Sequence, residues 1–554
     1  MLSVCSVVKK NIYVMLKKVL ILFLFLAVVF WLTMNYGVGR SCDEVHQVLQ
    51  WRQFCLRGIV ACAVLVIFSF VVNPKNIVSV IEFSIITVCT VEGVYSMLQL
   101  YGVLPSLHSI FKVTGSFYNP GPLGGFIAVA IPIILHNIGL FHNNKIAKYI
   151  LYTALIINII ALPSTMSRTA WIAAIVSSIY VLVGNGKLVG VRAALPAPIK
   201  NHPRIFILFF TFSMLIGAFF LWHIKHDSAV GRLLLWKISA LAIADAPFWG
   251  NENFASAYGA AQEKYFANND ATISEKLAAG SPDYAFNEYL QIGVEYGLPI
   301  LILILAALVI IIRKSYLEKS FGLSGALLSI MVFAFASYPL HLPVFVAVVL
   351  LILFAIIINN SRKIYAIIIP VSVILFASFN LSSYNQKSTN VVSWTRMQIL
   401  YRNKCYGDVV NRYSTIYDAM SWNPRFVYEY GHSLFKSKKY DAAIPVLERA
   451  ASISADPMPL NILGECHQAL QQYETAENYY RRAANRIPSR LYPHYLLYFL
   501  YCEDGFANDS LRRIEYEKVM KMTIKTESPA TRDLRRLVEE KECSISKIGN
   551  NGDE

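Results

Sequence analysis

The chain has 554 residues, of which 56% are hydrophobic and only 15% are charged, and its mean hydropathy is +0.47. Soluble domains average about 25% charged residues, so this composition excludes an ordinary soluble globular protein and indicates an integral membrane protein. The formal net charge of +15 comes mainly from short loops between apolar runs, where basic residues orient a membrane protein, and this distribution argues against a nucleic-acid partner.

Near-continuous apolar runs predict eleven membrane-spanning helices. They lie at about 17–36, 55–73, 76–100, 120–140, 146–163, 168–184, 204–224, 295–313, 321–338, 340–359 and 363–381. The first run is interpreted as a span and not as a signal peptide, because it is long and no clear small-residue cleavage site follows it.

Lysine and arginine counts in alternate short loops indicate the orientation. With the N-terminus inside, sixteen fall in the cytoplasmic set: Lys9, Lys10, Lys17, Lys18, Lys75, Lys145, Lys148, Lys187, Arg192, Lys200, Arg204, Arg313, Lys314, Lys319, Arg362 and Lys363. The opposite loops hold five: Arg40, Arg52, Arg57, Lys112 and Arg168. An odd number of spans then places the loop 225–294 and the tail after 381 outside, which in a bacterium is the periplasm.

The tail is predicted to be a soluble α-solenoid. Glycines recur at Gly431 and Gly464, 33 residues apart, and prolines punctuate the ends of the units. Small residues where two helices cross, with Leu447 and Tyr480 as large residues beyond them, resemble tetratricopeptide repeats. The predicted fold is therefore all-α: a polytopic membrane bundle over residues 1–381, followed by a repeat domain over residues 382–554 that binds a protein or peptide.

A basic residue stands at the outer membrane edge between the fifth and sixth predicted spans. Arg168 follows Ser167 in a polar turn, on the side where the positive-inside rule disfavours arginine. Polar groups at the membrane edge are functional candidates because they are expensive to keep there. A planar guanidinium donates bidentately and suits a phosphate or pyrophosphate. The alternative is an interfacial arginine that extends toward lipid headgroups.

The long outer loop opens with an apolar segment that predicts a helix ended by Pro247 and Gly250. Arg232 and Trp236 share one face of this helix at i, i+4. The helix is too short to span the bilayer, so we expect it to lie along the membrane surface and to place a second cation near the headgroups. A plain amphipathic helix with a solvated arginine is the alternative.

The loop closes with a polar stripe formed by Asn287, Gln291 and Glu295, which fall at i, i+4, i+8 if the eighth span begins here. A carboxylate entering the membrane needs a partner or a water-filled cavity, and the outer arginines are candidate partners. A further turn at 115–125, rich in glycine and proline and containing Asn119, allows the backbone to approach a ligand closely.

Several classes of chemistry find no support in the sequence. The chain has no Walker loop, no Gly-x-Gly-x-x-Gly after a strand, no His-Glu-x-x-His and no Gly-x-Ser-x-Gly. Nine cysteines without a Cys-x-x-Cys pair argue against a disulfide framework and a zinc site. No metal or cofactor is therefore expected.

Taken in order, four pieces of this sequence resemble the O-antigen ligase and polymerase family, which includes bacterial O-linked oligosaccharyltransferases. The pieces are 164–171, 232–250, 287–297 and 337–339, and the resemblance covers roughly residues 75–360. Each piece alone is degenerate, whereas the ordered set is specific. Members with a tetratricopeptide tail look especially similar.

The resemblance implies a metal-independent glycosyltransferase of the bacterial inner membrane that takes a glycan from undecaprenyl pyrophosphate at the periplasmic face. Arg168 and Arg232 match the family's outer arginines and are expected to bind the pyrophosphate, whose negative charge grows as the sugar departs. The further assignments are Ser167, Trp236 and Asn119 to the donor, Asn287, Glu288 and Gln291 to the acceptor loop, and Glu295 and Asp283 to catalysis.

One position departs from the family's pattern. Ligases typically carry a histidine just before the asparagine of the closing motif, expected to activate the acceptor hydroxyl, but this chain has Phe286 before Asn287. His223, His226 and His341 lie in other outer segments and can approach in space. Glu288 or Asp283 can instead act as the base, or the attack needs no base because proton loss lags departure of a good leaving group.

The acceptor stays open between lipid A-core, a growing glycan and a protein Ser or Thr, and a repeat tail in the periplasm mildly favours a protein. A transporter or flippase of a lipid-linked or anionic substrate is the main alternative, although the polar residues crowd one face and no two halves match. A membrane scaffold that recruits partners through its tail is a third possibility.

Overall fold

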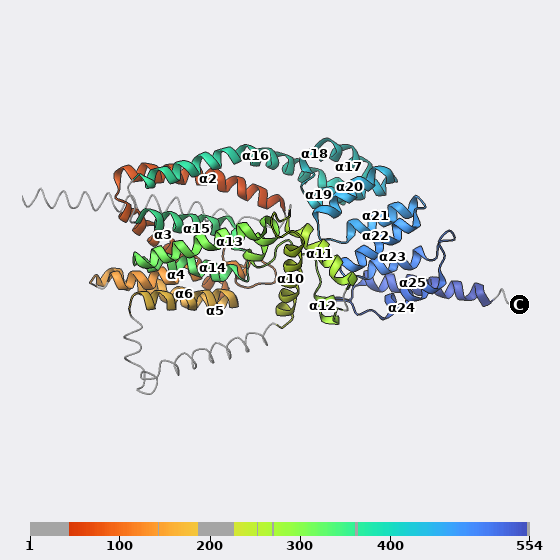
Figure 1. Ribbon diagram of the computed structural model, residues 1–554, viewed down its shortest axis with the longest axis horizontal. Coiled ribbons are helices and arrows are strands. Elements are labelled where there is room, and N and C mark those ends of the chain that lie inside the picture. The colour runs from red at the N-terminus through yellow and green to blue at the C-terminus, as the bar shows by residue number, and fades with distance from the viewer. Residues whose placement is uncertain are drawn as a thin grey trace, which may run out of the picture. The chain divides into compact units, whose positions relative to one another are not determined.

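The computed structural model describes residues 44–550 except for 142, 187–225, 252, 269–270 and 360–363. Within these residues the chain contains α-helices and short 3-10 helices and no strand, which confirms the all-α prediction (Figure 1). The described chain divides into two compact units. Unit 1 takes its residues from Met1–Leu221, Phe286–Glu288 and Ile302–Ser388, and unit 2 takes them from Trp222–Ala285, Tyr289–Leu301 and Thr389–Glu554.

Unit 1 is a bundle of apolar helices. Its elements are α2 (Glu44–Val71), α3 (Pro74–Leu100), α4 (Pro120–Leu140), α5 (Lys145–Ser164), α6 (Arg168–Gly184), α14 (Phe321–Ala334), η1 (Pro339–His341), α15 (Pro343–Asn359), and parts of α13 (Glu288–Leu317) and α16 (Tyr365–Arg402). Helix α4 is the central helix, since α3, α5, α6 and α14 all pack against it.

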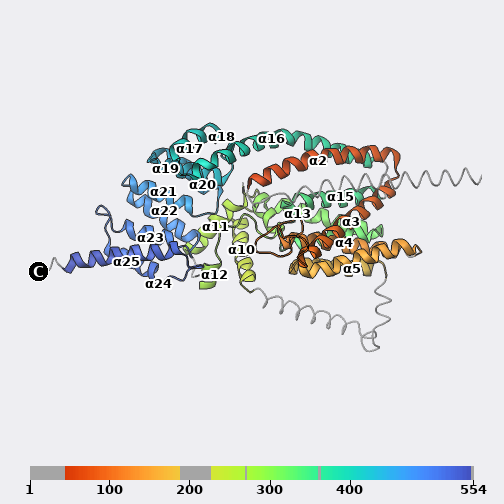
Figure 2. The same ribbon diagram turned by 180° about the vertical axis from the view of Figure 1, so that it is seen from behind.

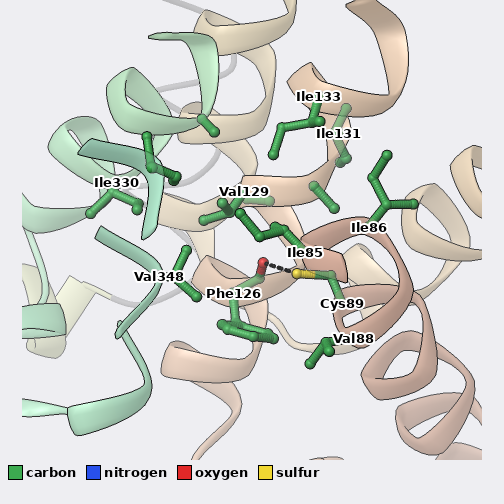
Figure 3. Packing of buried hydrophobic residues seen from close by; sticks show 14 of the residues in the cluster. Ile85, Ile86, Val88, Cys89, Phe126, Val129, Ile131, Ile133, Ile330 and Val348 are labelled. Carbon is green, nitrogen blue, oxygen red and sulfur yellow. Dashed lines mark hydrogen bonds between the residues drawn. The ribbon is translucent and has the colours of Figure 1, made fainter. Parts of the chain in front are cut away.

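Close packing around α4 depends on small residues. A Cβ atom added at Gly125 would overlap the ring of Phe333 in α14, and one at Gly325 would lie 2.7 Å from Val181 in α6. Small residues let membrane helices approach closely enough for their side chains to interdigitate. Figure 3 shows the result: Phe126 and Val129 are enclosed by neighbouring helices, and the Cys89 thiol donates to the Phe126 carbonyl over 3.2 Å.

The structure tests the predicted spans only in part. Six described helices are long and apolar enough to cross a membrane, and α6, α14 and α15 are shorter apolar helices, so the predicted count of eleven is not confirmed. The expected spans 17–36 and 204–224 lie outside the described residues. Helix α13 begins at Glu288, earlier than predicted, and α14 ends at Ala334, because the chain turns before Pro339 starts η1.

Unit 2 joins the outer loop to the tail. The loop supplies α10 (His226–Asp245), α11 (Phe254–Asn268) and α12 (Ile273–Ala278). The tail supplies α17 (Tyr406–Tyr413), η2 (Ser414–Ile416), α18 (Tyr417–Met420), α19 (Pro424–Lys436), α20 (Tyr440–Ile453), α21 (Met458–Ala469), α22 (Tyr473–Arg486), α23 (Leu491–Leu500), α24 (Asp509–Lys521) and α25 (Pro529–Asn550).

The tail forms successive helical hairpins, α19–α20, α21–α22 and α23–α24. A Cβ atom at Gly431 would lie 2.7 Å from Leu447, and one at Gly464 would overlap the ring of Tyr480. The small residues therefore face the large residues of the following helix, as the repeat pattern predicts.

Helix α11 of the loop packs directly on the second helices of the repeats, α20 and α22 (Figures 1 and 2). Glu263 accepts from Arg482 at 2.7 Å and from Arg486 at 2.9 Å, and the Arg486 side chain is buried. Gly259 lies against Ala455, where a Cβ atom would come within 2.8 Å of the backbone. The loop and the repeats therefore form one compact unit.

Candidate functional site

Polar turns that are far apart in the sequence meet at one end of α4 in unit 1. Asn119 caps this helix with its side-chain oxygen on the Gly121 N–H at 3.0 Å, and its amide donates to the Tyr338 hydroxyl over 3.2 Å. The ring of Tyr338 packs edge-on against Phe286, with centroids 5.2 Å apart. The turn before α4, the turn after α14 and the start of α13 are therefore neighbours.

A buried carboxylate ties the start of α13 to the turn after α14. The Glu288 side chain is only 3% exposed, and its Oε1 accepts from the Leu340 backbone N–H at 2.6 Å. The same oxygen lies 3.5 Å from Nδ1 of His341, which keeps 28% of its side chain exposed. The imidazole of His341 therefore lies beside a buried carboxylate, an arrangement that recurs where a histidine acts as a base.

The predicted arginine turn packs on the same end of α4. Ser167 precedes α6 and Arg168 is its first residue, half-buried. A Cβ atom at Gly124 in the first turns of α4 would lie 2.6 Å from the Thr165 hydroxyl and 3.0 Å from Ser167. The structure thus brings the Ser167–Arg168 turn, Asn119 and the Glu288 region to one end of unit 1.

The glycine-rich turn at 115–125 is anchored by two residues that the sequence analysis missed. Glu92 of α3 accepts from the Ser116 hydroxyl at 2.6 Å and from its N–H at 3.1 Å, and Gln99 accepts from the N–H groups of Thr114 and Gly115. Gly115 has φ +54°, a conformation that favours glycine. The sequence feature that could have identified Glu92 and Gln99 is the presence of a carboxylate and an amide inside an otherwise apolar predicted span.

Gln291 and Glu295 of the predicted closing stripe lie one turn apart in α13, within unit 2. The Gln291 amide donates to Glu295 at 2.6 Å, and its oxygen accepts from the Ala285 N–H at 2.8 Å. Asn287 is the buried residue just before α13. Asp283 is an exposed residue in the non-helical segment before α13, where partial desolvation by neighbouring atoms raises the pKa of its carboxyl above its usual range.

The kink of α13 explains the end of the closing motif. Gly297 has φ +80° and ψ 171°, and a Cβ atom there would lie 2.5 Å from the Phe248 carbonyl oxygen. The Leu298 N–H donates to the Pro247 carbonyl over 2.8 Å, and the Asn251 N–H donates to the Val294 carbonyl over 2.8 Å. The turn after α10 therefore fits closely against this kink.

Arg232 and Trp236 lie one turn apart in α10, as predicted, and both are half-buried. They belong to unit 2, whereas Arg168 belongs to unit 1. Among the described residues, no group of three or more His, Cys, Asp or Glu side chains is placed to hold a metal ion.

Two parts of the sequence match known protein families. Residues 151–305 match the family described as O-antigen ligase, and residues 424–457 and 460–490 match the tetratricopeptide repeat. The sequence therefore contains a segment similar to O-antigen ligases, followed by two segments similar to tetratricopeptide repeats. No curated protein matches the chain.

The O-antigen ligase match runs from α5 to the middle of α13 and so contains Arg168, Arg232 and the closing motif. The repeat matches coincide with the hairpins α19–α20 and α21–α22. An O-antigen ligase domain suggests transfer of a glycan from a lipid carrier to an acceptor.

Proposed function

We propose that this protein transfers a glycan from undecaprenyl pyrophosphate to an acceptor hydroxyl at the periplasmic face of a bacterial inner membrane. The observation that carries the proposal is the convergence of the Arg168 turn, Asn119 and the Glu288–His341 pair at one end of unit 1. The O-antigen ligase match supports the same reaction class. The acceptor is lipid A-core, a growing glycan or a protein.

In this proposal the arginines hold the donor. Arg168 and Arg232 bind the pyrophosphate, with Ser167, Trp236 and Asn119 around it. As the anomeric carbon–oxygen bond breaks, the electron pair leaves with undecaprenyl pyrophosphate, and fixed guanidinium groups stabilise that growing charge without a metal.

The proton of the acceptor hydroxyl goes to His341. The hydroxyl oxygen forms the new bond to the anomeric carbon, and the half-buried imidazole takes the proton, with the buried Glu288 carboxylate 3.5 Å from the ring. This pair supplies a base although Phe286 occupies the position before Asn287. Asn287, Gln291 and Glu295 shape the acceptor side, and Asp283 is the second candidate for the proton.

The test is glycan transfer in a strain that lacks the gene, complemented with wild type, Arg168→Ala or Arg232→Ala. Arg412→Ala is the matched control, because this exposed arginine lies in α17 of the repeat region. Lipopolysaccharide and periplasmic glycoproteins are compared on the same gels at equal protein level. We expect both site variants to lose a product that the control restores, and that product names the acceptor. Restoration of every product by both variants would contradict the proposal and favour a transporter.

A further inference from the structure

A cavity of about 730 Å³ lies within unit 2, between the outer loop and the repeats. The loop contributes Phe266, Ile273, Lys276 and Leu277, and the repeats contribute the end of α22 and the segment after it, His494 of α23, and the exposed side of α24. Its volume falls in the range of about 300–1,000 Å³ that small-molecule sites occupy. The ligase domain and the repeats thus build this cavity together.

The cavity lining is strongly basic. The lining residues Lys276, Arg513, Lys518 and Lys521 stand against Glu517, and the ionised Glu515 lies behind the wall, so four cations against two carboxylates leave a net of two positive charges. Lys521 donates to Glu517 at 3.1 Å, and Lys518 donates at 2.6 Å to a carboxylate behind the wall. Lys276 and Arg513 form no ion pair with any residue that the structure describes. Two exposed cations are therefore available to a ligand.

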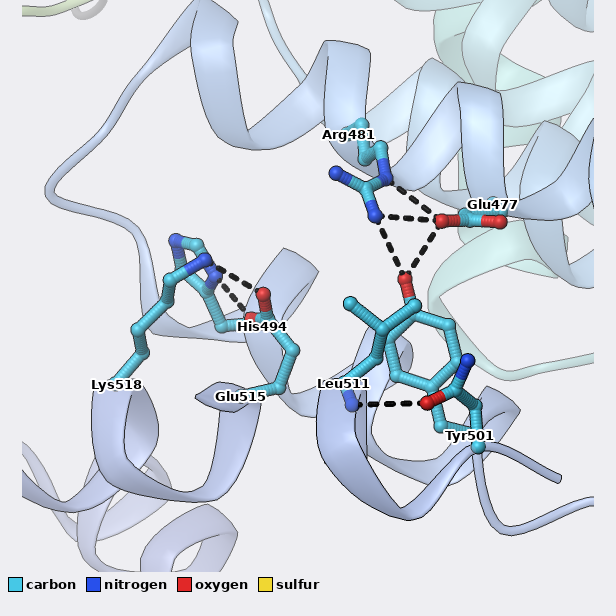
Figure 4. A network of polar contacts seen from close by, with 8 residues as sticks. Glu477, Arg481, His494, Tyr501, Leu511, Glu515 and Lys518 are labelled. Carbon is cyan, nitrogen blue, oxygen red and sulfur yellow. Dashed lines mark hydrogen bonds and ion pairs between the residues drawn. The ribbon is translucent and has the colours of Figure 1, made fainter. Parts of the chain in front are cut away.

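One wall of the cavity is held by the network in Figure 4. Glu515 is buried and accepts from Lys518 and from Nδ1 of His494, the latter at 2.7 Å. Burial alone would raise the pKa of Glu515, but the hydrogen bonds and charges of His494 and Lys518 hold it below its usual range. The carboxylate stays ionised, so it fixes both donors at the cavity surface.

The remaining lining mixes apolar surface with hydrogen-bonding groups. Ile273 and Ile514 are 68% and 49% exposed, although both are aliphatic, and Phe266 lies near them in the lining. Asn485, Ser489 and Thr523 add an amide and two hydroxyls. A saccharide matches this lining, because it has apolar C–H faces and hydroxyl groups at its edges. The excess of cations favours a saccharide that also carries negative charge.

The place of the cavity argues against an extended peptide. The first helices α19, α21 and α23 contact one another and so line the inner face of the solenoid, where such proteins usually bind extended partners. This cavity instead lies beside the second helices α22 and α24, and α12 of the loop lines another part of it. It is a compact site, separate from that inner face.

We propose that this cavity binds a sugar that carries carboxylate or phosphate groups, through Lys276 and Arg513. The proposal rests on the proposed glycan transfer and adds to it a holding site for an acidic segment of the acceptor, shared by the ligase loop and the repeats. The transfer chemistry itself stays in unit 1.

The test measures binding to the purified full chain in lipid nanodiscs. The probes are trigalacturonic acid, neutral maltotriose, triglutamate and inorganic phosphate, titrated at low and high salt. The Lys276→Glu, Arg513→Glu double variant is compared with Lys439→Glu, Arg412→Glu, which makes the same charge change at exposed repeat residues outside the cavity. Thermal unfolding of both variants checks that unit 2 is intact.

We expect trigalacturonic acid to bind more tightly than the other three probes, and the cavity variant to weaken it by about tenfold at low salt while the control stays within about twofold. The proposal would be overturned if maltotriose bound as tightly as trigalacturonic acid, or if triglutamate bound more tightly. It would also be overturned if inorganic phosphate displaced trigalacturonic acid at the same concentration, or if the two variants bound trigalacturonic acid with equal affinity. Because binding is measured without transfer, this result is independent of the arginine test above. A failed transfer assay with intact binding would contradict the transferase and not the anionic site.

Discussion

Replacing His341 by alanine tests the assignment of the base most directly. General base catalysis contributes about 10²–10⁴-fold, and the lower end applies when the leaving group is good, so transfer should fall about 100-fold. In Glu288→Gln the amide oxygen still accepts from the Leu340 N–H, but the negative charge 3.5 Å from the imidazole is lost. Two unit charges about 4 Å apart interact by about 1 kcal/mol in water and by more near a protein surface, so we expect about a tenfold fall in the transfer rate.

The assay is transfer from a labelled undecaprenyl-pyrophosphate glycan by the purified protein. Added imidazole should restore part of the rate of His341→Ala, because a free base can enter the space that the ring leaves, and it should not restore Arg168→Ala. His467→Ala, in α21 of the repeats, is the matched control and should retain the wild-type rate. The reasoning is wrong if His341→Ala folds normally and keeps more than half of the wild-type rate.

Three further changes probe the units themselves, each by thermal or urea unfolding of the purified protein. Glu263→Gln removes the charged partner of a buried arginine and should lower the unfolding free energy of unit 2 by about 3 kcal/mol. Lys264→Gln breaks only an exposed ion pair and should lower it by less than about 1 kcal/mol. Equal losses of unfolding free energy would refute the role of burial. A hydrogen bond from Lys237 lowers the pKa of Glu275 from 4.5 to about 2. The ionised carboxylate therefore stabilises the folded protein above pH 4.5, and this stabilisation is lost as the pH falls toward 2. Glu275→Gln should reduce the difference in unfolding free energy between pH 5 and pH 2, and an unchanged difference would contradict the lowered pKa. Gly297→Ala places a methyl group beside a carbonyl at a residue with positive φ, and it should lower the unfolding free energy by at least about 1–3 kcal/mol. Gly231→Ala, in a helix with open space around the residue, should not lower it. Two equally stable variants would argue against the kink.

Local patterns carried much of the prediction. The 33-residue spacing of Gly431 and Gly464 gave the repeat hairpins, because each small residue packs against a large one in the next helix of the same hairpin. The apolar segment that ends at Pro247 and Gly250 likewise predicted α10. Such features depend only on helix geometry within a few turns, which a sequence displays directly.

The contacts that define the candidate site are long-range and were not predictable in the same way. Glu288 accepts a hydrogen bond from Leu340, which lies 52 residues away in the sequence, and Asn119 donates to Tyr338, which lies 219 residues away. Their proximity depends on how the bundle helices are ordered in space, which hydropathy alone does not reveal. Glu92 was overlooked because it lies in an apolar run, where its partner in the turn at Ser116 becomes visible only in three dimensions.

The contact between α11 and the repeats bears on how the protein is made. Glu263 finds Arg486 across 223 residues, and further spans are synthesised between them. At about 5–20 residues per second, the ribosome needs roughly 11–45 s to supply that partner. During this interval the loop has emerged with the α11 face that will bury Tyr258 and Gln262 still uncovered. The loop therefore completes its fold only after nearly the whole chain has been synthesised, and a chaperone on its side of the membrane would act in that interval.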